Sequence, residues 1–512
     1  MENLKKFLKK AMVLLCCFTI CISAFACGGT TDVPSGGDDS GQLDIIVADQ
    51  GFGTLWLKNV IEGFKEKYPN VQVELKTQKL LDKVNLYLTS NKKNPYDIIF
   101  TEGSQVFTYA ETPYTIPGIE ECYEDITDVY NAIPEGEAKP IKEKMYDGIY
   151  EYFKTSDEKT YVIPYAMTLF GFMYNTDLIS DDELPNTTNE LVELCKAVEK
   201  RNESKGVNAI VWTKDGEYFD EIFETWWAQY EGRDGFMGYF KSEDISVLNQ
   251  TGRVKALEVI SSLIDYNNGY ADSDSPGLEF IPAQKRFMDG QAAFYPCGAW
   301  LENEMSEFYA PGTAHINYMR TPVISSIVEK LEYRNGSNYM EDSMLSAVIK
   351  AIDSGATSYA GVSESDFAKI KEAREMYYYE NIIDSAVIPS FSDAKELAKK
   401  FLIYMYSDEG IEKYTKANSG GSLPVYYDYS SVELQTSKMQ STRLEIMGKP
   451  CNYIYRPRHK SIASFDFYNT SIQNVLGGIS GVKTPQQVVD YTFNYYNANN
   501  QKEWNTLVAK KR

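Results

Sequence analysis

The side chains that most often bind metals or act as nucleophiles are scarce in this sequence. Only two histidines occur, His315 and His459, and neither belongs to an HExxH motif. GxSxG and P-loop motifs are also absent. Beyond residue 27 the cysteines are widely spaced and form no CxxC pair, which disfavours zinc and leaves disulfides and buried free thiols equally open: Cys122, Cys195, Cys297 and Cys451. We therefore expect no catalytic residue, no metal site and no cofactor.

Aromatic side chains, in contrast, are plentiful, with 39 tyrosines, 24 phenylalanines and 6 tryptophans. Tyrosine and tryptophan suit a binding site that is apolar on one face and wet at its edge. Trp300 stands out because it follows an apolar strand-like run, 292–298, that stops at Gly298. Its indole either faces an open site or caps the core of its domain.

The composition limits the classes of protein to consider. The chain has 512 residues, which is too long for one hydrophobic core, so we expect two lobes. Hydrophobic residues make up 43% and charged residues 24%, as in folded globular proteins. The formal net charge of −22 argues against binding to nucleic acid, because phosphates would be repelled.

The first residues have the layout of an export signal. Lysines precede an apolar run from Ala11 to Ala26, which is short for a spanning helix of about 20 residues. Small residues followed by Cys27 resemble the end of a bacterial lipoprotein signal, so residues 1–26 would be removed and Cys27 lipidated. An ordinary signal peptide with an incidental cysteine is the alternative. Residues 27–42 are rich in Gly, Ser, Thr and Asp and indicate a flexible linker behind the anchor.

The folded part begins with an α/β pattern. Strands are predicted at 43–49, 71–75 and 96–100, and a helix is predicted at 55–68. This order implies parallel pairing with right-handed crossovers. Ligands bind at the carboxyl ends of such strands, where the sequence places Asp49 to Gly53 and Thr101 to Glu102.

Six fragments along the chain occur in the order found in a known family. They are GFKEKYPNVQVEL, NPYDIIF, YVIPYAMTLFGFMYNTDLI, RFMDGQAAFYPCGAW, AKELAKKFLIYMYSDEGIEKY and SGGSLPV. The chain thereby resembles the extracellular solute-binding proteins of bacterial ABC importers, specifically the family 1 carbohydrate-binding group that is similar to maltose-binding protein. The resemblance covers roughly residues 43 to 500.

The resemblance implies an α/β fold of the type II periplasmic-binding-protein class, with two lobes and several crossings between them. Carried over to this chain, lobe one comprises 43–163 and 338–424, and lobe two comprises 164–337 and 425–512. Within this division, residues 343–353 form the strand that returns the chain to lobe one.

The resemblance also implies a function: a lipid-anchored, monomeric protein that binds a carbohydrate between its lobes and delivers it to permease subunits in the membrane. Trp300 would stack on the sugar, because a sugar ring offers a face of C–H groups to a flat aromatic ring. Trp226 and Trp227 lie where relatives present another aromatic ring. Adjacent residues on a helix point in different directions, so we expect only one of these two to face the cleft.

Further ligand contacts are expected at the rim of the cleft. Phe467 and Tyr468 match a family segment that brings a ring to the site, and Tyr165 lies at the first crossing. Asp49 and Glu102 would accept hydrogen bonds from sugar hydroxyls. Each has a structural alternative, namely hinge packing for Tyr165 and solvated or capping roles for the acids.

Two other classes of protein remain as alternatives. One is a surface-anchored solute sensor or adhesin built on the same fold, since fold alone does not settle function. The other is a secreted glycoside hydrolase, because 73 acidic residues make paired carboxylates easy to find. The ordered fragments favour binding without chemistry on the ligand.

Overall fold

The structure is a computed structural model, and it describes fourteen stretches of the chain. They are 40–49, 51–79, 96–101, 119–155, 157–213, 218–240, 245–264, 269–310, 312–380, 384–418, 420–434, 437–449, 451–455 and 484–499. Among these residues, no helix is long and apolar enough to cross a bilayer.

The first of two sheets has the strand order β2-β1-β3-β10-β4. Its strands are β1 (Ser40–Ala48), β2 (Asn70–Gln78), β3 (Ile98–Thr101), β4 (Val162–Pro164) and β10 (Ser385–Val387). β1 pairs in parallel with both β2 and β3, as the strand–helix–strand pattern predicts. We call the part of the molecule built on this sheet lobe one.

Helices cover the sheet of lobe one. They are α2 (Leu55–Lys67), α5 (Ile119–Cys122), α6 (Thr127–Asn131), α7 (Ile141–Lys144), α8 (Ile149–Phe153), α17 (Lys395–Met405) and α18 (Asp408–Ala417). α2 buries Trp56, Val60 and Phe64 at helical spacing, which is why the predicted helix forms here. The amphipathic stretch 394–414 divides into two helices because the side chain of Ser407 accepts a hydrogen bond from Gly410 N and caps α18.

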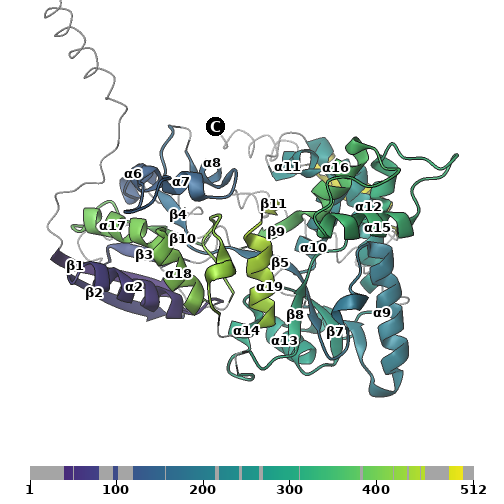
Figure 1. Ribbon diagram of the computed structural model, residues 1–512, viewed down its shortest axis with the longest axis horizontal. Helices are drawn as coiled ribbons and strands as arrows, with labels where there is room; N and C mark the ends of the chain where they lie inside the picture. Colours follow the sequence, from purple (N-terminus) through teal and green to yellow (C-terminus); the bar gives the residue numbers. More distant parts are fainter. Residues whose placement is uncertain are drawn as a thin grey trace, which may run out of the picture.

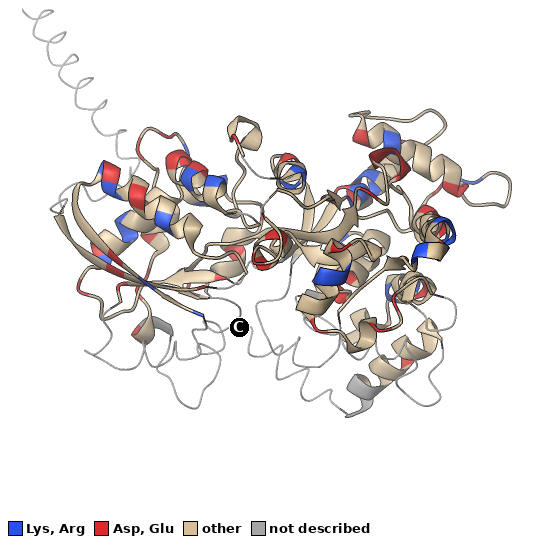
Figure 2. Cartoon of the chain, turned by 90° about the horizontal axis from the view of Figure 1, so that it is seen from below, with Lys and Arg blue, Asp and Glu red and all other residues tan. Residues whose placement is uncertain are grey.

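The second sheet has the order β11-β9-β5-β7-β6, and β8 also pairs with β5. Its strands are β5 (Thr168–Asn175), β6 (Asn208–Ile210), β7 (Ala292–Gly298), β8 (Ile316–Met319), β9 (Met376–Glu380) and β11 (Asn452–Tyr455). The helices around it are α9 (Thr188–Asn202), α10 (Asp220–Glu231), α11 (Arg233–Phe240), α12 (Thr251–Ile264), α13 (Phe280–Met288), α14 (Leu301–Glu304), α15 (Asp342–Asp353), α16 (Glu364–Arg374), α19 (Lys438–Met447) and α22 (Pro485–Asn499). This part is lobe two, and the lobes lie side by side in Figure 1. Acidic and basic residues are interspersed over the helices of both lobes (Figure 2).

One element differs from the sequence prediction. Residues 342–353 form the helix α15 and not a strand, because Leu345, Val348, Ile349 and Ile352 are spaced for burial on one face of a helix. The chain then continues through α16 into β9, which pairs with β5 in the second sheet. The return to the first sheet therefore occurs at β10 and not near residue 338.

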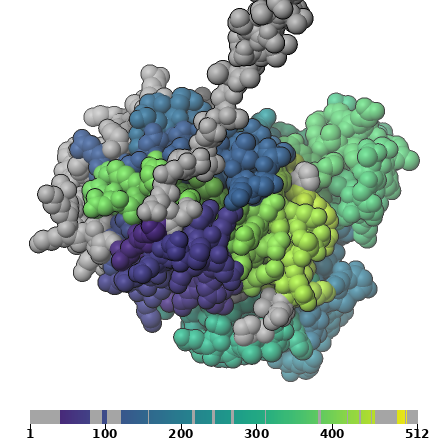
Figure 3. Space-filling model, turned by 60° about the vertical axis from the view of Figure 1, so that its left-hand side comes forward, coloured from purple at the N-terminus to yellow at the C-terminus, as the bar shows by residue number. Residues whose placement is uncertain are grey.

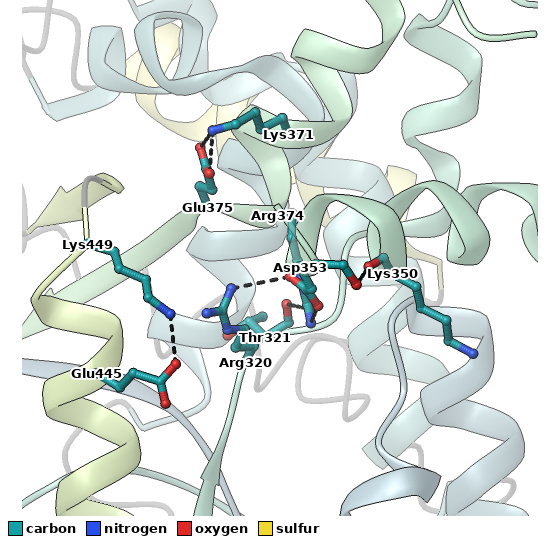
Figure 4. A network of polar contacts seen from close by, with 10 residues as sticks. Arg320, Thr321, Lys350, Asp353, Lys371, Arg374, Glu375, Glu445 and Lys449 are labelled. Carbon is teal, nitrogen blue, oxygen red and sulfur yellow. Dashed lines mark hydrogen bonds and ion pairs between the residues drawn. The ribbon is translucent and has the colours of Figure 1, made fainter. Parts of the chain in front are cut away.

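A charged cluster fastens α15 and α16 to the sheet of lobe two (Figure 4). The guanidinium of Arg374, at the end of α16, donates to both carboxylate oxygens of Asp353 at the end of α15, at 2.7 to 3.2 Å. Arg320, just after β8, donates to the same carboxylate at 3.3 Å. Paired guanidinium–carboxylate bonds of this kind fix orientation, so the cluster holds the two helices beside the end of β8 and the start of β9.

The segments that cross between the lobes pair with one another, and we call them the hinge. Met167, between β4 and β5, exchanges two backbone hydrogen bonds of 2.8 Å with Ser422. Tyr165 N donates to Asp384 O at 2.8 Å, so the crossing before β10 joins the same group.

The four cysteines beyond residue 27 are free thiols, which settles the alternative that the sequence left open. Cys122, Cys195 and Cys297 are buried and Cys451 is half-buried. Burial raises the pKa of the Cys451 thiol to about 11, so it is protonated at neutral pH.

Candidate functional site

Strand β7 delivers Trp300 to the edge of lobe two. The strand is buried along its whole length between β5 and β6, and Trp300 follows as the residue before α14. The indole folds back over Gly298: a Cβ on that glycine would lie 2.0 Å from the ring. The close approach therefore requires a glycine at the end of the strand.

Trp300 lies in a cluster of rings that comes from both lobes. Phe170 and Tyr218 of lobe two have ring centroids 5.9 and 5.8 Å from the indole. Phe52 of lobe one meets the indole edge-on at 6.4 Å. The indole is only 7% exposed in this arrangement.

Polar atoms border the ring cluster. The indole N–H of Trp300 donates to the hydroxyl of Tyr218 at 3.1 Å. Burial raises the pKa of Tyr218 well above its ordinary value, so the hydroxyl keeps its proton and can itself donate. The cluster thus combines flat apolar faces with hydrogen-bonding groups at their edge.

The loop after β1 brings lobe one against this cluster. Gly51 and Gly53 have φ angles of 22° and 63°, a conformation that favours glycine. Between them Phe52 points at Trp300, and the side-chain amide of Asn303 donates to Gly51 O at 2.6 Å. We call Gly51, Phe52, Gly53, Trp300 and Asn303 the cleft junction.

Gly420 and Gly421 pack on the same junction. A Cβ on Gly420 would lie 2.6 Å from Ala299 O, and one on Gly421 would lie 3.2 Å from the Phe52 ring. The side chain of Asn418 accepts hydrogen bonds from both glycine N–H groups. In Figure 3 the purple β1–α2 segment lies beside the yellow-green segment that follows residue 420.

Two carboxyl groups on α14 lie beneath the junction. Glu302 is 7% exposed and accepts hydrogen bonds from Ser437 at 2.5 Å and from the amide of Gln440 at 3.3 Å. Burial raises the pKa of Glu302 above its ordinary value. Burial also raises the pKa of Glu304 to about 7, against one stabilising hydrogen bond from Gln284 at 2.6 Å.

The two adjacent tryptophans of α10 occupy the core of lobe two. Both side chains are fully buried. The indole N–H of Trp226 donates to Pro322 O at 3.0 Å, and that of Trp227 donates to the side chain of Gln250 at 2.7 Å. This is the behaviour of core tryptophans, and neither ring joins the cleft junction.

The other expected contacts have different positions. Tyr165 is buried in lobe one, where it stacks on Trp56 with ring centroids 5.1 Å apart. Asp49 is exposed at the carboxyl end of β1. Glu102, Phe467, Tyr468 and the lipidation candidate Cys27 lie outside the described residues.

Four side chains of the site are not predicted by the sequence: Phe52, Phe170, Tyr218 and Asn303. Phe52 lies within the rim segment Asp49 to Gly53, so the sequence indicates its position, but no local pattern distinguishes its ring as a contact. Asn303 follows Trp300 by three residues, which is about one helical turn and places both on one side of α14. Within the described stretches, no group of three or more His, Cys, Asp or Glu side chains could hold a metal ion.

Comparison with known proteins supports one class of protein. A family model described as bacterial extracellular solute-binding protein matches residues 59–308. The galactooligosaccharide-binding protein of Bacillus subtilis is 24% identical over 340 residues, which cover 65% of this chain and 70% of that protein. The diacetylchitobiose binding protein of Streptomyces coelicolor is 23% identical over 279 residues, covering 54% of this chain and 56% of that protein.

Solved structures of low sequence identity share the fold. The GacH receptor of Streptomyces glaucescens matches with a TM-score of 0.55 and 15% identity, covering 90% of this chain and 98% of the receptor. A family 1 extracellular solute-binding protein from Bifidobacterium longum matches with a TM-score of 0.52 and 16% identity, covering 90% and 99%. The predicted two-lobed α/β fold is thereby confirmed.

Proposed function

We propose that this chain, which matches the bacterial extracellular solute-binding protein family over residues 59–308, is a member of that family. In this proposal it captures a carbohydrate, of oligosaccharide size, between its lobes. It then delivers the sugar to the permease subunits of an ABC importer. The single observation that carries this proposal is Trp300, which lies where rings of both lobes meet at the cleft junction.

The chemistry of the junction suits a sugar. The face of the Trp300 indole can pack against the C–H groups of a pyranose. The hydroxyl groups of the sugar can then form hydrogen bonds with the polar protein atoms at the edge of the indole. The hydroxyl of Tyr218 lies at the edge of the indole. The exposed carboxylate of Asp49 directly follows β1 and precedes Gly51 by two residues. The two curated relatives are named for a galactooligosaccharide and for diacetylchitobiose, both of which are short carbohydrates. Glu102, Phe467 and Tyr468 remain proposed contacts.

Capture follows from the two-lobed architecture and needs no bond to be made or broken. A ligand that touches both lobes binds the closed state more tightly than the open state, so it shifts the population toward closure. The closed lobes present the surface that the permease recognises. We therefore propose that the protein binds its sugar without turnover and acts as a monomer.

We also propose that Cys27 carries a lipid and holds the protein at the outer face of the cell membrane. Residues 27–42 then act as the tether between anchor and lobe one. Mass spectrometry of the mature N-terminus tests this, since a diacylated Cys27 is expected. Cys27→Ser should release the protein into the medium, and an unmodified N-terminus in the membrane fraction would contradict the proposal.

Binding is tested by calorimetry and thermal shift with galacto- and chito-oligosaccharides, comparing the wild type with Trp300→Ala. The bound sugar should raise the melting temperature of the wild type by mass action. Loss of the stacked ring should weaken binding by about 10- to 100-fold. Tyr339→Ala, which removes a 47% exposed ring elsewhere on lobe two, is the control and should bind normally.

Two results would overturn the proposal. If a non-carbohydrate solute alone stabilises the wild type, the family stands and the carbohydrate ligand is wrong. If oligosaccharides are cleaved in excess of the protein present, the protein is an enzyme.

A further inference from the structure

We propose that Asn303 is a positioning residue that latches the two lobes together across the cleft. The inference rests on the proposed function, because it assigns a role in the closure that traps the sugar. Its basis is the hydrogen bond from the side-chain amide of Asn303 in lobe two to Gly51 O in lobe one, at 2.6 Å.

The donor of this bond is held in place from within lobe two. Asn303 N donates to Trp300 O at 2.9 Å, which fixes the first turn of α14. The preceding residue, Glu302, is buried and accepts hydrogen bonds from Ser437, the N-cap of α19, and from Gln440 within that helix. Asn303 therefore presents its amide from a turn that is anchored on both sides.

The acceptor is a backbone carbonyl, and the conformation of the loop sets its direction. Gly51 and Gly53 both have positive φ angles, and Trp56 of α2 donates its indole N–H to Gly53 O at 3.0 Å. A Cβ on Gly53 would lie 3.5 Å from the Asn303 side chain, so the two segments are in van der Waals contact. The loop is thus shaped to meet the turn that carries Trp300.

The consequence for ligand binding differs from that of a direct contact. The amide of Asn303 already has a protein partner, so it stabilises the closed state and not a particular sugar. A neutral hydrogen bond of this kind changes an equilibrium by about 2- to 10-fold. The apparent affinity of a ligand that binds only the closed state is proportional to the fraction of protein in that state. If the variant lowers this fraction, the affinity falls by the same factor. Every sugar should therefore be weakened by one common factor.

The experiment compares Asn303→Ala with Asn189→Ala in the full mature protein. Asn189 is an exposed asparagine of lobe two whose amide bonds to Asp342 in the same lobe at 3.2 Å. The distance between the lobes without ligand is measured with two spin labels, one at Glu62→Cys on α2 and one at Glu307→Cys after α14. Cys451→Ser removes the half-buried free thiol, which could otherwise be labelled as well. Calorimetry with several oligosaccharides that bind the wild type reports affinity.

Asn303→Ala should lengthen the mean distance between the labels without ligand and weaken all bound sugars by the same factor of about 2 to 10, whereas Asn189→Ala should change neither. Unchanged label distances in Asn303→Ala overturn the latch. A loss of affinity confined to one sugar also overturns it, because that pattern marks a direct contact. If the wild type binds no sugar, the proposed function fails, while the label distances still decide whether the latch exists.

Discussion

Among the places where the two lobes touch, the hinge and the cleft junction use different kinds of bond. At the hinge, Met167 and Ser422 exchange a pair of backbone hydrogen bonds, and Tyr165 adds another to Asp384. At the cleft junction, the described residues of the two lobes form one side-chain hydrogen bond with each other, from Asn303 to Gly51 O, and one edge-on ring contact between Phe52 and Trp300. The hinge is therefore built to persist while the junction can open and close.

A buried polar network strengthens the hinge further. Arg443 of α19 is 1% exposed and donates to Ser422 at 2.8 Å and to the side chain of Gln440 at 3.0 Å. Gln440 in turn donates to Ala299 O and to Glu302 at 3.3 Å. A buried cation is costly to strand without partners, so this network opposes separation of the hinge. It also supports the turn that carries Trp300.

The largest effect is expected from Gln440→Leu, which removes the central side chain of the network. Arg443, Glu302 and Ala299 O would each lose a hydrogen bond in a buried setting. The free energy of unfolding should fall by about 3 kcal/mol, as measured by urea denaturation.

Gln486→Leu is the matched control because Gln486 is exposed on α22 and bonds to Asp490 of the same helix. It should change stability by less than about 0.5 kcal/mol. Equal losses in the two variants would contradict the importance of the hinge network.

The second largest effect is a pH dependence of stability, which we expect from a residue next to the cleft junction and not from the hinge. Burial lowers the pKa of Arg443 only to about 10, so the hinge keeps its charge across the neutral range. Glu304, beneath the junction, has its pKa raised from 4.5 to about 7. The folded state binds this proton more tightly than the unfolded state, so the stability that the proton gives is complete below pH 4.5 and is lost as the pH rises through 7.

Glu304→Gln removes that titration. Compared with the variant, the wild type should lose roughly 2 to 3 kcal/mol of stability between pH 4.5 and pH 7. Denaturation curves at several pH values measure the difference. Parallel pH profiles for the two proteins would show that Glu304 titrates normally.

Local patterns in the sequence predicted the elements that deliver the site, but not the pairs that assemble it. The periodicity of 43–100 predicted β1, α2 and β2, and the apolar run before Gly298 predicted β7. The prediction of a strand at 343–353 is wrong, because the apolar residues of this segment follow a helical period. The Asn303–Gly51 bond joins positions 252 residues apart, and no short-range pattern encodes such a contact.

The tryptophans also show that local sequence patterns do not predict which side chains meet in the site. In the sequence, Trp226, Trp227 and Trp300 are equally good candidates for a binding site. In the structure, the indole N–H groups of Trp226 and Trp227 donate hydrogen bonds inside lobe two, whereas the ring of Trp300 contacts Phe52 of lobe one. Burial in a core and placement at an interface both favour large aromatic residues. Only the neighbours, which come from distant segments, distinguish the two.

The smallest effect is expected at the junction itself, from Phe52→Leu. Leucine keeps much of the apolar packing of Phe52 and removes its edge-on contact with Trp300, which should lower stability by about 1 kcal/mol. A double-mutant cycle with Trp300→Leu isolates the contact between the two rings, because each single variant removes it. A coupling energy near zero would mean that the rings do not hold the lobes together, and the latch of Asn303 would be the sole bond of the junction among the described residues. A coupling energy above the loss in Gln440→Leu would reverse the comparison, making the cleft side and not the hinge the firmer connection between the lobes.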